Sequence, residues 1–326
     1  MTEWGPRVIA GQTIAPGTRT ELELRPARMP SGGWMSIPVV AFHGANPGPT
    51  IWLSAAIHGD EVCGVEIIRQ VAGGLQPTSM RGTVLAVPVL NVPGFSHGER
   101  YMPDRRDLNR SFPGSRRGSL ASRFAHTFMT EIVGHCDVGI DLHTGSDHRR
   151  NVPQIRADLT DPATNELAHV FGAPFTVHSR LRDGSLREAA CATGATALLY
   201  EAGEAWRFER PAIDVGVRGV RRVLAHLGII DPAVLGQPSA PTVVLSATSW
   251  TRSPQSGLVR LEVDLGDEVE ARQPIGAVAD AIGNNLRILR AVRGGYVIGR
   301  NESPVVHRGD ALIHVGTPTS ESTLLP

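Results

Sequence analysis

The chain has 326 residues, and its 41% hydrophobic and 20% charged composition is that of a globular protein with one large or two ordinary domains. Its 32 basic and 32 acidic residues balance, which argues against a nucleic-acid-binding surface. Every basic residue is Arg, so mechanisms that need a Lys, such as Schiff-base formation or attachment of lipoyl and biotinyl groups, are excluded.

The cysteines and the N-terminal sequence indicate a compartment. Three widely spaced cysteines do not suggest a disulfide framework, and they are typical of a reducing environment. The N-terminus shows no basic and apolar leader, and no apolar run is long enough to span a bilayer. We therefore expect a cytoplasmic protein with neither a membrane nor a nucleic-acid partner.

An α/β pattern runs through the first two thirds of the chain. Residues 20–42 alternate roughly and contain Pro and Gly, which indicates short antiparallel strands. Residues 50–57 form a nearly continuous apolar run, as expected of a strand buried on both faces, and a helical pattern follows over 61–70. Further strands are expected over 83–91 and 138–142, and further helices over 120–136 and 215–227. This alternation predicts an α/β sheet with helices on both faces, which binds ligands at the carboxyl ends of its strands.

The last third of the chain has a different character. Residues 231–241 contain three Pro and one Gly and are interpreted as a linker. Beyond it, alternation and Gly-rich turns predict a small all-β domain that resembles a barrel-sandwich hybrid of the lipoyl and biotinyl kind, without the Lys. We predict a first domain over 1–235 that includes an N-terminal β segment over 1–49, an all-β domain over 236–317 and a disordered tail over 318–326.

Two segments at strand ends suggest a metal site. His58-Gly59-Asp60-Glu61 follows the strand over 50–57, and His143 ends the later strand at the same edge of the sheet. Zinc favours such nitrogen and oxygen ligands, and catalytic sites keep one position open for water. A lone H-x-x-E motif also occurs by chance, so the prediction rests on both segments together. Cys63 could compete as a soft ligand, but a place in the core is favoured.

A long loop offers groups that suit a carboxylate. Within Asp107-Leu108-Asn109-Arg110-Ser111-Phe112-Pro113-Gly114, Arg110 has a planar fork and Asn109 adds a neutral donor. Alone, such an Arg would more often be solvated. Further candidates in the loop are Arg100, Arg105 and Arg106. Asp107 could instead orient a ligating imidazole.

A fourth segment could supply a general base. An apolar strand ends in Glu201, and Gly203 permits a sharp exit of the chain. A carboxylate beside a metal-bound water could take its proton and pass it to a leaving amine. Glu204 is the rival, although its position beyond Gly203 suggests exposure to solvent. By itself Glu201 would more often be a salt-bridged strand end, so the hypothesis depends on all four segments sharing one rim.

In this order, H-G-D-E, D-L-N-R-S-F-P-G, D-L-H-T-G and E-A-G resemble the succinylglutamate desuccinylase/aspartoacylase family, the acylase branch of the zinc carboxypeptidase-like hydrolases. The resemblance covers about residues 50–227. It implies a zinc-carboxypeptidase-like mixed sheet in a catalytic domain, followed by a β-rich domain, here over 242–316. It also implies a single Zn²⁺ per chain, held by His58, Glu61 and His143.

The resemblance assigns further roles. Asn109 and Arg110 would bind the substrate carboxylate, and Glu201 would be the general base. A further Arg of the family maps best onto Arg100, although Arg105 is possible. Arg156, in an apolar strand after the zinc-binding segment, could bind a charged or polar group of the substrate; residues 148–150 could equally be a solvated turn.

The function implied is zinc-dependent hydrolysis of the amide of an N-acyl amino acid or a related small carboxylate amide. A metallocarboxypeptidase acting on short peptides could use the same zinc and the same Asn-Arg pair, and a non-catalytic relative would keep only the fold. The β domain favours the deacylase because it could close the cleft to all but a small acyl group. Its edge strands could also pair in a homo-oligomer. The sequence does not name the acyl group, the amino acid or the metal.

Overall fold

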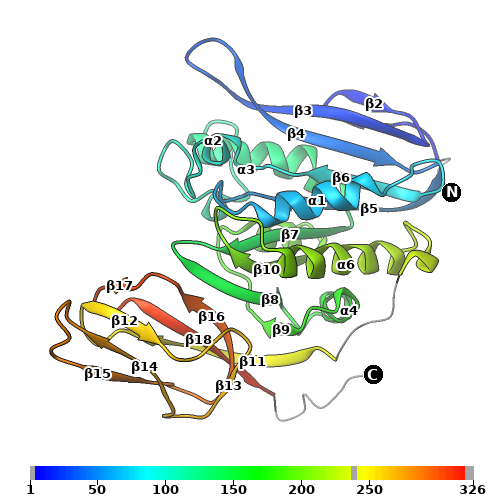
Figure 1. Cartoon of the computed structure of the whole chain (residues 1–326). Helices are drawn as coiled ribbons and strands as arrows, with labels where there is room; N and C mark the ends of the chain where they lie inside the picture. The colour runs from blue at the N-terminus through cyan, green and yellow to red at the C-terminus, as the bar shows by residue number, and fades with distance from the viewer. Residues whose placement is uncertain (1–3, 236–240, 320–326) are drawn as a thin grey trace.

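Residues 4–235 and 241–319 are described by a computed structural model, shown in Figure 1. A mixed sheet of twelve strands runs through the molecule. In spatial order its strands are β13 (Glu268–Val269), β16 (Gly295–Asn301), β18 (Ala311–Pro318), β11 (Val243–Arg252), β9 (Phe175–His178), β8 (Arg149–Ala157), β10 (Thr196–Glu204), β7 (Val138–Gly145), β5 (Asn46–Ala55), β6 (Arg81–Val87), β4 (Trp34–His43) and β3 (Thr18–Arg28). Strands β6, β5, β7 and β10 are parallel to one another. Strand β4 is antiparallel to β6, β3 is antiparallel to β4, and β8 is antiparallel to β10.

Helices cover both faces of this sheet, as the α/β pattern predicts. The helices α1 (Cys63–Gly73), α4 (Pro162–Phe171) and α6 (Arg210–His226) share one hydrophobic core, and Figure 1 shows α1 and α6 in front of the sheet. The helices α3 (Leu120–Glu131) and α5 (Leu186–Ala192) belong to a second core on the other face. Shorter elements are β1 (Arg7–Ile9), β2 (Gln12–Ile14), α2 (Val92–His97) and the 3₁₀ turns η1 (Leu108–Arg110), η2 (Val133–His135) and η3 (Pro232–Val234). Of the helices described, none combines the length and apolar character needed to cross a membrane.

The strand ends that matter for the site differ in detail from the sequence-based expectation. The last six residues of β5 are all buried, in agreement with the apolar run, but the strand ends at Ala55. The expected helix is present as α1, but it begins at Cys63, two residues after the expected start at about 61. The chain between β5 and α1 is therefore free to form a tight turn. Helix α6 begins at Arg210, earlier than expected, with a Pro in its first turn.

The C-terminal region is all-β, as expected, and it shares the large sheet with the rest of the chain. Strand β11 pairs with β9 in parallel, and β16 pairs with β8 antiparallel. A second sheet of four strands faces β13, β16 and β18 across a common core: β15 (Arg287–Arg290), β14 (Pro274–Ala279), β12 (Gly257–Leu261) and β17 (Val305–Val306). The division into domains at residue 235 stays a prediction. Residues 236–240 of the expected linker and 320–326 of the expected tail lie outside the described residues, and Pro318 ends β18.

Close packing between β5 and β7 leads to a stability prediction. Gly139 of β7 is the register partner of Trp52 in β5, and a Cβ at Gly139 would enter the buried Trp52 ring. We expect Gly139→Ala to lower the free energy of unfolding by about 1–3 kcal/mol, measured by urea denaturation. Gly73→Ala is the control, because a Cβ at Gly73, near the end of α1, meets no atom within 4 Å. An equal loss in both variants would contradict the packing argument.

Candidate active site

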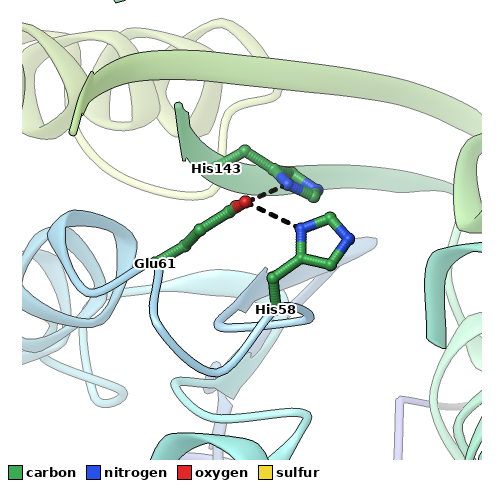
Figure 2. A group of neighbouring side chains, drawn as sticks. All are labelled: His58, Glu61 and His143. Carbon is green, nitrogen blue, oxygen red and sulfur yellow. Dashed lines mark hydrogen bonds and ion pairs between the residues drawn. The ribbon is translucent and has the colours of Figure 1, made fainter. Parts of the chain in front are cut away.

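Three buried side chains converge at one edge of the large sheet (Figure 2). Nδ1 of His58 lies 2.8 Å from Oε1 of Glu61, and Nδ1 of His143 lies 2.8 Å from Oε2 of the same carboxylate. Their exposed fractions are only 4%, 1% and 4% for His58, Glu61 and His143. The structure thus brings together the three residues predicted to bind a metal.

The local fold explains how they meet. His58 and Glu61 occupy the turn between β5 and α1, in which the Glu61 N–H donates to the His58 carbonyl (3.1 Å). Gly59 lies between them, and a Cβ there would collide with the backbone of Gly94 and Phe95 in α2. His143 comes from β7, the strand next to β5. A glycine is therefore required for this turn to fit under α2.

Each imidazole is held in place from its other nitrogen. Nε2 of His58 lies 3.1 Å from Oδ1 of Asp107, and Nε2 of His143 lies 2.8 Å from Oδ2 of Asp141. The Ser54 hydroxyl in turn donates to Asp141 Oδ1 (2.7 Å). Histidines that bind metals are commonly oriented by such carboxylates. The two Nδ1 atoms and the Glu61 carboxylate therefore form a donor set that fits a divalent metal.

The electrostatics of the cluster are dominated by its opposite charges. Burial favours the neutral imidazole of His143, but Asp141 and Glu61 outweigh burial and raise its pKa well above the usual value. Burial also opposes ionisation of Glu61, yet the two imidazoles hold its pKa well below the usual range. The pKa of Asp107 is lowered in the same way, against burial, by His58 and Arg100. The carboxylates of Glu61 and Asp107 are therefore ionised at neutral pH.

Of the loop arginines, Arg100 lies next to the cluster. Its Nη1 donates to Glu61 Oε1 (3.3 Å) and to the hydroxyl of Ser146 (2.5 Å), and Nη2 is 3.4 Å from Asp107 Oδ2. The Ser146 hydroxyl also donates to Glu61 Oε1 (2.5 Å). Arg105 is exposed and does not line the cavity beside the cluster. The geometry thus favours Arg100 over Arg105.

A cavity of about 300 Å³ adjoins the cluster, and Asn109 and Arg110 line it. Asn109 Oδ1 accepts a hydrogen bond from the Leu186 N–H (2.9 Å). The side-chain amide nitrogen of Asn109 takes no part in this bond. Burial lowers the pKa of Arg110, with Arg182 and Arg100 acting in the same direction and Asp107 opposing them. Within the described residues no carboxylate lies at ion-pair distance from Arg110 or Arg182. Nη1 of Arg110 donates to the Asn109 carbonyl (2.5 Å), and the remaining N–H groups of this guanidinium are available to an anion.

Glu201 also lines this cavity, from the second half of β10 and in register with His143 of β7. Its Oε2 accepts from Asn151 Nδ2 (2.6 Å), and its Oε1 is 3.7 Å from Nε of Arg156. The expectation that Glu204 is exposed is wrong, because only 5% of it is accessible. The β10 strand bends between Glu201 and Glu204, and Glu204 faces Arg207 (3.5 Å) in a different hollow. Glu201 is therefore the carboxylate that shares the cavity with the cluster.

Sequence reasoning missed several residues here. Asp141 stands two residues before His143 in β7, so both side chains lie on one face of the strand, a signal that was available. The roles of Ser54 and Asn151 had no such signal. Trp250 and His314 also line the cavity, although they belong to the C-terminal region. Cys63 lies in the core, as expected, and burial raises its thiol pKa to about 11.

Comparison with known proteins identifies related sequences. The family model of the succinylglutamate desuccinylase/aspartoacylase catalytic domain matches residues 47–227. An N-alpha-acetyl-L-2,4-diaminobutyric acid deacetylase of Halomonas elongata is 30% identical over 293 residues, covering 86% of this chain and 85% of that protein. A succinylglutamate desuccinylase of Burkholderia cenocepacia is 34% identical over 110 residues, 29% of this chain and 30% of its own.

Solved structures resemble the whole chain. The product-bound ectoine utilization protein EutE (DoeB) of Ruegeria pomeroyi superposes with a TM-score of 0.84 at 26% identity, covering 96% of this chain and 98% of that one. A succinylglutamate desuccinylase/aspartoacylase of Rhodobacter sphaeroides gives 0.83 at 26% identity, covering 94% and 98%. The chain therefore belongs to the succinylglutamate desuccinylase/aspartoacylase family. It is an amide hydrolase of the N-acyl amino acid deacylase type.

Proposed function

We propose that the protein is a zinc-dependent hydrolase that removes the acyl group from an N-acyl amino acid or a related small carboxylate amide. The observation that carries the proposal is the cluster itself. Two imidazoles present Nδ1 to one carboxylate at 2.8 Å while each Nε2 is held by an aspartate. Such a buried donor set has little use in a protein that only binds amino acids.

His58, Glu61 and His143 would hold the zinc ion, with Asp107 and Asp141 fixing the two rings. Bound zinc would supply Lewis acidity toward the acyl carbonyl and the attacking water. Arg100 lies beside Glu61 and is positioned to donate to the oxygen on which negative charge develops. The three proposed zinc ligands and Arg100 line the cavity from three separate parts of the chain.

Glu201 would move the proton. Its carboxylate would accept a proton from the attacking water as the new C–O bond forms at the acyl carbon. The same carboxyl group would then protonate the amide nitrogen as the C–N bond breaks, which releases the free amine and the carboxylic acid. Asn151 donates to Glu201 Oε2 and keeps the carboxylate directed into the cavity.

Asn109 and Arg110 would bind the α-carboxylate of the amino acid, and Arg110→Ala tests this. Hydrogen bonds to charged groups contribute about 1.5–3 kcal/mol, so we expect KM to rise about 10- to 100-fold with a smaller change in kcat. Steady-state kinetics of the variant would show this split. Arg106→Ala is the control, because Arg106 is exposed and approaches Asp104 only at 4.0 Å. A fall in kcat alone would argue against carboxylate binding by Arg110.

A hydrolysis panel tests the proposed function directly. Zinc-loaded protein would be incubated with N-acetyl, N-succinyl and N-formyl amino acids and with short peptides, with and without a chelator, and the products identified by mass spectrometry. Chelator-sensitive release of a free amino acid is the expected result. Trimming of peptides from the carboxyl end would make the protein a metallocarboxypeptidase. If protein with stoichiometric zinc hydrolysed none of these substrates, the proposal would be contradicted.

The cavity favours a small substrate over a peptide. Its volume is about 300 Å³, and Trp250 and His314 of the C-terminal region form part of its wall. The Halomonas elongata relative is named for an N-acetylated diamino acid, which is a substrate of this size class. Cytoplasmic localisation and a homo-oligomeric state stay predictions.

A further inference from the structure

Trp250 and His314 are built into the cavity wall by the pairing of strands. Trp250 on β11 and His314 on β18 are register partners, and their rings stack with centroids 4.3 Å apart and planes 2° from parallel. His314 is also the register partner of Gly299 on β16, and Gly299 pairs with Asn151 on β8. These four residues form one row across the sheet, because register partners lie on the same face.

Gly299 leaves room in the middle of this row. A Cβ at Gly299 would lie 2.9 Å from Asn151 Oδ1, 3.2 Å from His314 Cβ and 3.6 Å from the Trp250 ring. Asn151 in turn donates to Glu201, the proposed base. The row therefore connects the stacked His–Trp pair to Asn151, which contacts Glu201, and both ends of the row line the same cavity.

His314 has an unused nitrogen in this wall. The residue is 3% exposed, and Nδ1 has no hydrogen-bond partner among the described residues. Burial, and to a smaller extent Arg156, lowers the pKa of His314 to about 3, so the ring is neutral at physiological pH. A buried polar atom left without a partner costs about 1–3 kcal/mol, which favours a ligand that supplies one.

Arg156 lines the same cavity and holds a second nitrogen without a hydrogen-bond partner in the described part of the chain. Its Nε is buried, forms no hydrogen bond within the described residues and lies 3.7 Å from Glu201 Oε1, too far for one. Arginine can only donate, and its charge would repel an ammonium group. The two nitrogens together therefore suit an oxygen that accepts hydrogen bonds.

We propose that His314 and Arg156 form a specificity subsite that binds a carboxylate or carboxamide oxygen at the end of one arm of the substrate. Trp250 is a positioning residue, because its stacking fixes the orientation of the His314 ring. The arm is either the acyl group or the amino-acid side chain, and both would offer the same oxygen. The inference rests on the proposed deacylase function and adds a residue from the C-terminal region to it.

Matched substrates test the subsite. The side-chain series consists of N-acetyl-L-aspartate, N-acetyl-L-asparagine, N-acetyl-L-leucine and N-acetyl-L-2,4-diaminobutyrate, of which the first three have side chains of similar shape. The acyl series compares N-succinyl with N-pentanoyl on one amino acid. In one series we expect kcat/KM for the oxygen-bearing arm to exceed that for the apolar arm at least about tenfold, as a charge-assisted hydrogen bond would give. A preference for the diaminobutyrate in the side-chain series, with no preference for succinyl in the acyl series, would overturn the proposal.

His314→Phe removes both nitrogens and keeps a ring to stack on Trp250, and we expect it to reduce that ratio to about twofold or less. His314→Gln restores a polar group and should recover part of the preference, which a purely structural role would not explain. His135→Phe is the control, since His135 is exposed on η2 and does not line the cavity. An unchanged ratio in folded His314→Phe would overturn the subsite.

A binding measurement separates this inference from the proposed function. Calorimetry would compare L-aspartate with L-leucine and succinate with butyrate, which needs no turnover. We expect the oxygen-bearing member of one pair to bind at least about tenfold more tightly to the wild-type protein than to His314→Phe. If this difference in binding were found but no substrate were hydrolysed, the proposed deacylase function would be contradicted and the subsite would be retained. Equal binding by both proteins would overturn the subsite alone.

Discussion

Glu201→Gln is expected to lower kcat by about 10²–10⁴-fold, because general acid–base catalysis contributes that much and the amide cannot accept the proton. The substitution should leave the fold and the metal content intact. Gln can still accept from Asn151, which donates to Oε2 at 2.6 Å, and Glu201 is not one of the three side chains that could hold the metal. Steady-state kinetics, with zinc measured by mass spectrometry, would show a loss of turnover without a loss of metal.

Glu204→Gln is the matched control for this prediction. Glu204 is on the same strand and is also buried, but it pairs with Arg207 and does not line the cavity. We expect its turnover to stay within about threefold of wild type, as is usual for a residue away from the chemistry. If Glu204→Gln lost activity while Glu201→Gln kept it, the base would have to be reassigned to Glu204.

His143→Ala is expected to abolish both tight metal binding and hydrolysis. The variant removes one of three ligands and leaves Asp141 buried without its imidazole partner. Loss of an orienting partner alone typically costs 10- to 100-fold, so loss of the ligand should cost more. Dialysis of the wild-type protein against a chelator should produce the same inactive state, and zinc should restore activity only to the wild type.

Metal content provides a readout that is independent of activity. Wild-type protein should retain about one zinc per chain after gel filtration, and His143→Ala should retain far less. His135→Ala is the control, since His135 is exposed and remote from the cluster. Full activity in chelator-treated protein shown to be free of metal would rule out the proposed role of zinc.

Much of the site could be predicted because its residues follow buried strands. His143 follows a run that is buried along its whole length in β7, and Glu201 ends the apolar stretch of β10. Strands buried on both faces have a strong apolar signal, and their parallel arrangement places their carboxyl ends together. The metal cluster and the place of Glu201 in one cavity are therefore consequences of local patterns.

Other details depended on contacts that no local pattern encodes. Helix α1 begins after Glu61 because the turn fits under α2, where only Gly59 leaves room. Glu204 is buried, contrary to expectation, because β10 bends after Glu201 and turns that side chain toward Arg207. Arg100 is preferred over Arg105 because its guanidinium reaches Glu61 and Ser146 from a loop with no periodicity.

The sequence by itself thus predicted the class of enzyme, through the family that its four motifs resemble, together with three candidate metal ligands and the α/β architecture, because these motifs lie at the ends of apolar strands. Only the tertiary structure decided what closes the cavity. Trp250, His314 and Gly299 lie in a β-rich region whose sequence pattern indicates strands but no functional residues. They form one row with Asn151 because β16 pairs with β8. Strand pairing between distant segments depends on packing of the whole molecule, which is why this wall could not be predicted from residue order.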